Sequence, residues 1–121
     1  MNTIYSTRIE NIGTKAKEFF EANMFITFKQ NAPQELIDYC FIHSENNLVE
    51  EIKAKDILCI DDVTYEVKAV GELVNQNLKD LGHITYNFLG EEEAKVAGTL
   101  YLEKKEIAPI GVGTIIKIIR K

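Results

Sequence analysis

Apolar and polar residues alternate in short segments along most of the chain. In residues 63–70, Val63, Tyr65, Val67 and Ala69 fall on one face of an extended segment, and polar side chains fall between them. Segments of β-branched, aromatic or alternating character are found at residues 3–12, 24–28, 39–43, 57–60, 63–70, 83–89, 99–103 and 114–119. These segments predict short strands, and the pair of aspartates at 61–62 predicts a hairpin between two of them.

One segment near the N-terminus has a helical spacing instead. Ala16, Phe19 and Phe20 are three and four residues apart, which places them on one face of a helix. Thr14 is a suitable N-cap residue, and Asn23 is suited to a left-handed stop. A second, short helix is predicted to begin at Pro33, and a helical turn is expected within the polar connection at 75–82.

Seven or eight strands with one N-terminal helix and short helical turns predict a mainly β protein. At 121 residues, without a glycine- or serine-rich linker, residues 1–121 are expected to form a single domain. A small closed barrel and a sandwich-like barrel both fit this length. Closure would also remove the unpaired strand edges that an open sheet exposes.

The composition narrows the class of protein further. Apolar residues make up 45% and charged residues 27%, as in ordinary globular proteins, and the net charge is −5. An acidic surface repels a phosphate backbone, so we expect no nucleic-acid partner. The chain has no signal-peptide pattern and no apolar run of about 20 residues, which predicts a cytoplasmic protein without membrane insertion. Cys40 and Cys59 are then expected to be free thiols.

Histidine is the main candidate for chemistry, because the glycine-rich nucleotide loops, HExxH and GxSxG are all missing from the sequence. His43 ends an apolar strand and precedes the turn-forming residues 44–47, which places it near a rim within reach of solvent or a partner. A neutral imidazole has one unprotonated, nucleophilic ring nitrogen. The simpler interpretation is a surface histidine without a function.

His83 is the second histidine and opens another predicted strand. Its imidazole is a candidate to support a group bound to His43, although sequence alone does not show whether the two meet. Together with Cys40 and Cys59 the two histidines also form a Cys2His2 set of zinc-ligand types. That spacing is weak evidence, because residues three apart on a strand point to opposite faces, and both cysteines fit a core role.

Several blocks of the sequence resemble one family of transport proteins. The matching residues are Ala32-Pro33, Tyr39-Cys40-Phe41-Ile42-His43, Ile12-Gly13-Thr14, Ala69-Val70-Gly71, Leu81-Gly82-His83 and the segment from Pro109 to Gly113. In these blocks the chain is similar to the IIA component of the glucitol/sorbitol-specific sugar phosphotransferase system (PTS), over nearly its whole length.

This resemblance implies a function and a site. His43 would be the phosphorylated residue of a phosphocarrier that accepts its phosphoryl group from the phosphocarrier protein HPr. A cysteine of the IIB domain of the sugar permease would receive it, for uptake and phosphorylation of glucitol or sorbitol. The family is cytoplasmic with a compact β-barrel, and it calls for no metal or nucleotide cofactor. The turn after His43 differs from the family, which leaves the Ser44 hydroxyl as a candidate phosphate-binding group.

A carrier that exchanges with two proteins is expected to hold His43 on an exposed, shallow surface. Three other interpretations stay open at this point. In the first, the chain is a non-catalytic β-barrel module that binds a ligand or a protein. In the second it is a metal-binding domain, and in the third it is a regulator switched by phosphorylation of His43. The sequence allows a homodimer without requiring one.

Overall fold

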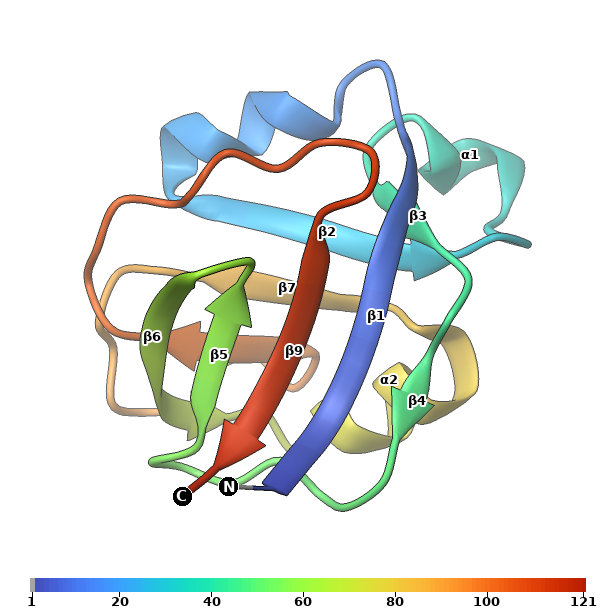
Figure 1. The fold of residues 1–121 in the computed structure, drawn as a ribbon. Helices are drawn as coiled ribbons and strands as arrows, with labels where there is room; N and C mark the ends of the chain where they lie inside the picture. The colour runs from blue at the N-terminus through green and yellow to red at the C-terminus, as the bar shows by residue number, and fades with distance from the viewer. Residues whose placement is uncertain (1) are drawn as a thin grey trace.

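The computed structural model describes residues 2–121, which form nine strands and three short helices (Figure 1). The strands are β1 (Asn2–Ile12), β2 (Met24–Lys29), β3 (Phe41–His43), β4 (Asn47–Leu48), β5 (Ile57–Ile60), β6 (Val63–Val70), β7 (Ile84–Asn87), β8 (Thr99–Leu102) and β9 (Ile115–Arg120). The helices are the 3₁₀-helix η1 (Ala16–Ala22) and the α-helices α1 (Gln34–Ile37) and α2 (Val74–Leu81). The prediction of a mainly β protein is therefore confirmed.

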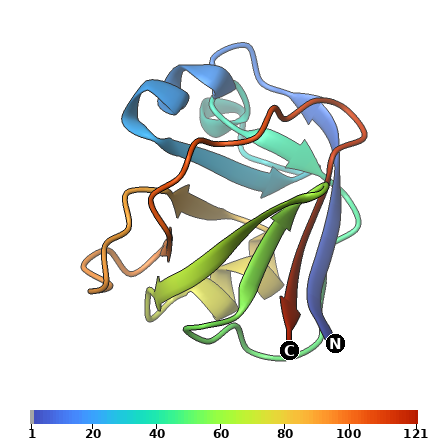
Figure 2. The same cartoon turned by 60° about the vertical axis from the view of Figure 1, so that its left-hand side comes forward.

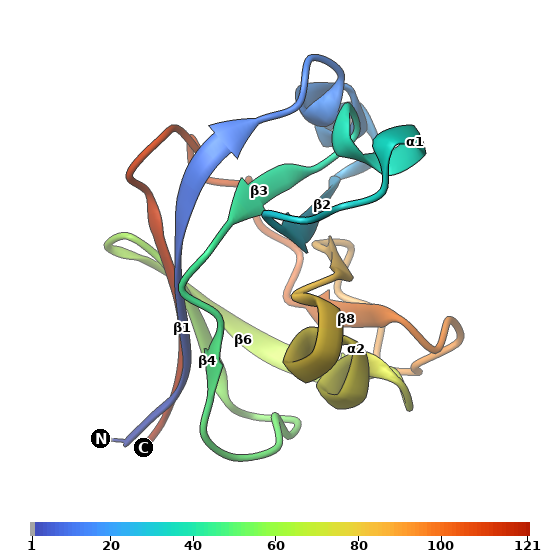
Figure 3. The same ribbon diagram turned by 90° about the vertical axis from the view of Figure 1, so that its right-hand side faces the viewer.

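Hydrogen bonds connect the strands into one ring. The order is β3-β2-β7-β8-β6-β5-β9-β1-β4, and a further pairing between β1 and β3 closes it. β1 is long enough to pair with two strands along one edge. Tyr5 and Ser6 pair with β4, and Ile9 to Ile12 pair with β3. Figure 3 shows β1 curving from the end where the chain termini lie toward β3. This curvature lets β1 pair with β3, with Ile9 opposite His43.

The interior of the ring is filled by apolar side chains. The β6 pattern is confirmed, since Tyr65, Val67 and Ala69 are buried along one face. Phe25 stacks on Tyr86 with ring centroids 4.5 Å apart and meets Phe41 edge-on at 5.7 Å. Such aromatic contacts add to the free energy gained by burying the rings. The core therefore extends directly under Phe41, two residues before His43.

Both ends of the chain lie side by side in the same sheet (Figure 2). Asn2 pairs with Arg120 in the register of β1 and β9. Arg120 also donates to both carboxylate oxygens of the buried Asp56, from Nε at 2.8 Å and from Nη2 at 2.9 Å. A two-point pair of this kind fixes the last strand against the start of β5.

The prediction of an N-terminal helix is wrong in its type. Residues 16–22 form a 3₁₀-helix whose N-cap is Lys15 rather than Thr14. A spacing of three and four fits both helix types within seven residues, so the pattern does not separate them. The predicted left-handed stop at Asn23 is confirmed by its φ of 58°. The connection expected to hold a helical turn forms the full helix α2.

No helix within residues 2–121 has the length and apolar character needed to cross a membrane.

Candidate functional site

Alternation along β3 directs His43 toward the interior of the ring. Phe41 belongs to the main core, Ile42 to a smaller cluster on the outer face with Phe28 and Cys40, and His43 again faces inward. The neighbouring strand β2 runs parallel to β3 and places Lys29 opposite His43. The two strands thus end together, with a lysine and a histidine at adjacent positions.

The His43 ring is completely buried, with 0% of the residue exposed. The prediction that this imidazole lies on an exposed, shallow surface is therefore wrong. It is covered by the turn that follows α2, where Gly82 adopts a left-handed conformation with φ of 61°. A β-carbon at Gly82 would lie only 2.6 Å from His43 Cε1, so a close approach of backbone to ring requires glycine here. The sequence gives no direct sign of this cover, because it comes from a segment 39 residues away.

Both ring nitrogens of His43 have a hydrogen-bond partner. Nε2 lies 2.8 Å from the Gly82 carbonyl oxygen and Nδ1 lies 2.7 Å from Oγ1 of Thr7. A carbonyl oxygen only accepts, so Nε2 bears the proton and donates, while Nδ1 of the neutral ring accepts from the Thr7 hydroxyl. Thr7 is itself 1% exposed and lies on β1. These two bonds fix the orientation and the tautomer of the imidazole.

Burial lowers the pKa of His43 below its ordinary value of 6.5. The hydrogen bond to the Gly82 carbonyl acts in the opposite direction, the positive charge of Lys29 lowers the pKa further, and the negative charge of Glu10 raises it. Because the net direction is downward, the ring is neutral near pH 7. A neutral imidazole has the lone pair that a nucleophile requires.

Ser44 follows His43 and lies at the rim, where its hydroxyl donates to the Glu10 carboxylate. Glu10 also accepts from the side-chain amide of Gln30 at 3.3 Å. Next to them is an open depression of about 380 Å³, and the residues that line it are Lys29, Gln30, Asn31, Ser44 and Asn46. The surroundings of His43 on this side are therefore polar, with one lysine and one carboxylate.

The structure does not bring the imidazole of His83 to that of His43. The His83 ring stacks on Phe28 with centroids 4.4 Å apart, on the outer face of the β2–β3 pair, whereas His43 faces inward. Its Nδ1 lies 3.0 Å from the Thr27 carbonyl oxygen and donates to it. The Thr27 hydroxyl in turn donates to the Gly82 carbonyl at 3.1 Å. His83 thus binds β2 through Thr27, and it directly follows Gly82, whose carbonyl binds His43.

The cysteines belong to the packed structure. Burial raises the pKa of the Cys40 thiol to about 11 and also raises that of Cys59, where the charge of Lys117 opposes the shift. Within residues 2–121 no group of three or more histidine, cysteine, aspartate or glutamate residues is arranged to hold a metal ion. The interpretation of Cys40, His43, Cys59 and His83 as a zinc site is therefore wrong.

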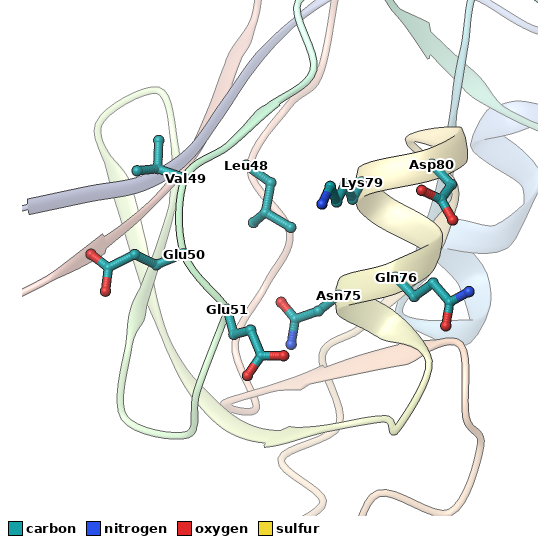
Figure 4. Close-up of a pocket in the computed structure, with 8 residues that line it drawn as sticks. All are labelled: Leu48, Val49, Glu50, Glu51, Asn75, Gln76, Lys79 and Asp80. Carbon is teal, nitrogen blue, oxygen red and sulfur yellow. The ribbon is translucent and has the colours of Figure 1, made fainter.

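A second hollow, of about 490 Å³, lies between β4 with the loop after it and helix α2 (Figure 4). Its lining includes the carboxylates of Glu50, Glu51 and Asp80, which disfavour an anionic ligand. It does not include His43. The two regions are connected by Asn46, whose side-chain amide donates to the Leu78 carbonyl of α2 at 2.6 Å.

Thr7, Lys29 and Gly82 are the residues of this site that sequence reasoning missed. Gly82 was within a matching block but had no role assigned to it. Lys29 ends a predicted strand, as His43 does, yet only the parallel register of β2 and β3 makes them neighbours. Thr7 is one of several threonines in strands, and only the pairing of β1 with β3 distinguishes it.

Comparisons with known proteins agree over almost the whole chain. The family model described as "PTS system glucitol/sorbitol-specific IIA component" matches residues 4–117, which include His43. Proteins named "PTS system glucitol/sorbitol-specific EIIA component" from Shigella flexneri and from Escherichia coli (strain K12) are each 35% identical over 117 residues, covering 97% of this chain and 95% of theirs. The crystal structure of a PTS system IIA component from Enterococcus faecalis V583 is similar with a TM-score of 0.81 at 27% identity, covering 95% of this chain and 99% of that one.

Proposed function

The chain belongs to the family of glucitol/sorbitol-specific IIA components of the sugar phosphotransferase system, and from this premise we propose that His43 is the residue on which it carries the phosphoryl group. The IIA components are phosphoryl carriers, so the chain is a transferase rather than a module that only binds a ligand. The observation that supports His43 is its neutral ring, held at both nitrogens by Thr7 and Gly82.

The reaction follows from that arrangement. A ring nitrogen attacks the phosphorus of the incoming phosphohistidine, so a new nitrogen–phosphorus bond forms as the donor's bond breaks and the electron pair returns to the donor imidazole. Because burial lowers the pKa of His43, its ring is unprotonated at the pH of the cell. Fixing the ring in one orientation lowers the entropic cost of reaching the in-line geometry. The phosphoryl group then leaves by the same step in reverse, toward the second partner.

Access to the ring requires the Gly82 turn to move. The Thr7 side of His43 faces the buried interior, whereas the Gly82 side is next to Lys29 and the open depression. The phosphoryl group therefore approaches Nε2, after the Gly82 carbonyl has left it. The Nε2 proton is lost to solvent and Nδ1 takes one up, and the Thr7 hydroxyl then accepts from Nδ1, since a hydroxyl both donates and accepts.

The family supports two protein partners for this chain. Phospho-HPr is the donor, and a cysteine of the IIB domain of a sugar permease is the acceptor, both in the cytoplasm. The names of the relatives support glucitol or sorbitol as the sugar that is finally phosphorylated. Phosphorylation adds close to two negative charges to a chain whose net charge is −5. Unequal affinity of the two charge states for the two partners would favour transfer in one direction.

The other two predicted residues receive different roles. Ser44 has the role of donating to a phosphoryl oxygen once its hydroxyl turns away from Glu10, and its position next to His43 in the sequence supports this role. His83 is a positioning residue, because its bond to the Thr27 carbonyl stabilises the strand on which the Gly82 turn rests. Neither role requires contact between the two imidazoles.

A reconstituted transfer assay tests this function. Enzyme I, HPr and labelled phosphoenolpyruvate are incubated with the wild-type chain or with His43→Ala, and a IIB domain is added afterwards. The wild-type chain is expected to take up an acid-labile, alkali-stable label and to lose it to IIB, and His43→Ala is expected to stay unlabelled. A wild-type chain that takes no label from competent phospho-HPr would contradict the proposal and favour the module that binds without transferring.

A further inference from the structure

Lys29 lies beside His43 and forms no ion pair within the described part of the chain. The ion pairs within residues 2–121 join Lys68 to Glu66 and Arg120 to Glu50 and Asp56, and none includes Lys29. The side chain is half-buried at the end of β2. A lysine that is partly removed from water and has no partner leaves its charge available to an anion.

The stem of the Lys29 side chain and the His43 ring both lie against Gly82. The point where a β-carbon of Gly82 would lie is 2.5 Å from Lys29 Cγ and 2.8 Å from His43 Nε2, so both side chains converge on the same small space. Three further bonds of the lysine side chain extend beyond Cγ and let the ammonium group move. The same side chain lines the open depression that Ser44 and Asn46 also border. The ammonium group can thus follow a phosphoryl group that enters from solvent.

The opposite charge at this rim is that of Glu10. Its carboxylate accepts from the Ser44 hydroxyl and from the Gln30 amide, and its charge acts on His43 in the direction opposite to that of Lys29. A phosphoryl group on His43 would therefore be attracted to one neighbour and repelled by the other.

We infer that Lys29 is the cation that binds the phosphoryl group on His43, and that Glu10 opposes it. This inference rests on the proposed function in one respect, that His43 takes a phosphoryl group. The ammonium group pairs with the dianion after the Gly82 turn opens, so its effect is on the phosphorylated chain. A lysine in this role acts as a point charge on a flexible stem.

The second ionisation of the phosphoryl group reports the pairing directly. A nearby positive charge favours the dianion and lowers the pKa of the phosphoryl group, and a nearby negative charge raises it. Lys29→Met is therefore expected to raise that pKa, by roughly 1 to 3 units for an opposite charge a few ångströms away. Glu10→Gln is expected to lower it. A residue with a merely structural role would not produce shifts of opposite sign in these two variants.

The experiment follows the phosphorus-31 chemical shift of phosphorylated His43 against pH. Phosphoramidate serves as the donor, because it transfers its phosphoryl group to imidazole with release of ammonia and needs no protein partner. Four chains are compared: wild type, Lys29→Met, Glu10→Gln and the control Lys17→Met, which removes an exposed lysine from η1. The circular dichroism of each chain confirms that it is folded.

The inference predicts a raised pKa in Lys29→Met, a lowered pKa in Glu10→Gln and the wild-type value in Lys17→Met. Equal values in wild type and Lys29→Met would overturn it, and so would an equal shift in Lys17→Met. If phosphoramidate labels His43 and phospho-HPr does not, the proposed function fails while the same titration still decides the role of Lys29. If neither donor labels His43, both fail.

Discussion

The carbonyl oxygen of Gly82 lies 2.8 Å from Nε2 of His43, at the point where helix α2 ends. This one bond determines which nitrogen bears the proton in the resting chain and covers the ring at the same time. The end of α2 is therefore coupled to the proposed phosphoryl acceptor, although the two are far apart in the sequence. In the proposed mechanism, release of that bond makes His43 accessible.

Substitution of Gly82 by alanine is expected to damage both stability and transfer. The new β-carbon would be 2.6 Å from His43 Cε1, in a left-handed backbone conformation that alanine adopts poorly. We expect a loss of about 1–3 kcal/mol in the free energy of unfolding, measured by urea denaturation, and slower uptake of label. Gly111→Ala is the matched control, because no heavy atom lies within 4 Å of its β-carbon position. Equal losses in the two variants would contradict the role given to Gly82.

Thr7 is expected to matter through its hydroxyl rather than its shape. Thr7→Val keeps the volume but leaves Nδ1 of the buried ring without a partner, which costs about 1–3 kcal/mol of stability. Thr7→Ser keeps the hydroxyl, loses a methyl group and should retain most of the transfer rate. The rate of phosphoryl uptake from phospho-HPr, measured for both variants, distinguishes the two effects. If Thr7→Val is phosphorylated as fast as wild type, the hydroxyl has no part in holding the ring.

The lowered pKa of His43 predicts how stability depends on pH. Near pH 7 the ring is neutral in both the folded and the unfolded chain. As the pH falls below about 6.5, the unfolded chain takes up a proton that the folded chain resists, so the free energy of unfolding decreases. The contribution of His43 to the free energy of unfolding is therefore fully present above the pKa of the unfolded chain. It is lost as the pH falls toward the lower pKa of the folded chain.

Urea denaturation between pH 7.5 and 5 measures this dependence. The wild-type chain is expected to lose stability over that range more steeply than His43→Gln, because the variant lacks the titrating ring. Parallel curves for the two chains would show that His43 has the same pKa in the folded and unfolded states.

His83 is expected to affect the rate of transfer without being required for it. His83→Phe retains an aromatic ring to stack on Phe28 and removes the hydrogen bond to the Thr27 carbonyl. His83→Ala removes both contacts. We expect phosphorylation of His43 to persist in each variant and to slow by a few-fold, more in His83→Ala, measured as the initial rate of label uptake. A wild-type rate in both variants would contradict the positioning role of His83.

The strands were predictable because their patterns are local. Alternation at 63–70 and the aspartates between two apolar runs reproduce β6 and the hairpin, in which Ile60 pairs with Val63. The helix type at 16–22 was not predictable, since seven residues with a spacing of three and four satisfy two geometries. The ring closure depends on β1 pairing with both β9 and β3, a long-range choice that no local pattern contains.

The site shows the same division between local and long-range information. His43 stands out in the sequence because it follows a run of apolar residues and lies in a segment that resembles a known family. Its burial was not predictable, because the cover is the backbone of Gly82 and not a side chain with a pattern of its own. Lys29 becomes a neighbour only through the parallel register of β2 and β3. The candidate residue His43 could thus be predicted from the sequence, and its surroundings could not.

Mass spectrometry can locate the phosphoryl group on the chain directly. The wild-type chain is phosphorylated by phospho-HPr, digested under alkaline conditions that preserve phosphohistidine, and its peptides are sequenced by fragmentation. One phosphorylated site is expected, at His43, and its label is expected to be lost in His43→Gln while the variant stays folded. A phosphoryl group found at His83 or on a cysteine, or one that persists in His43→Gln, would contradict it.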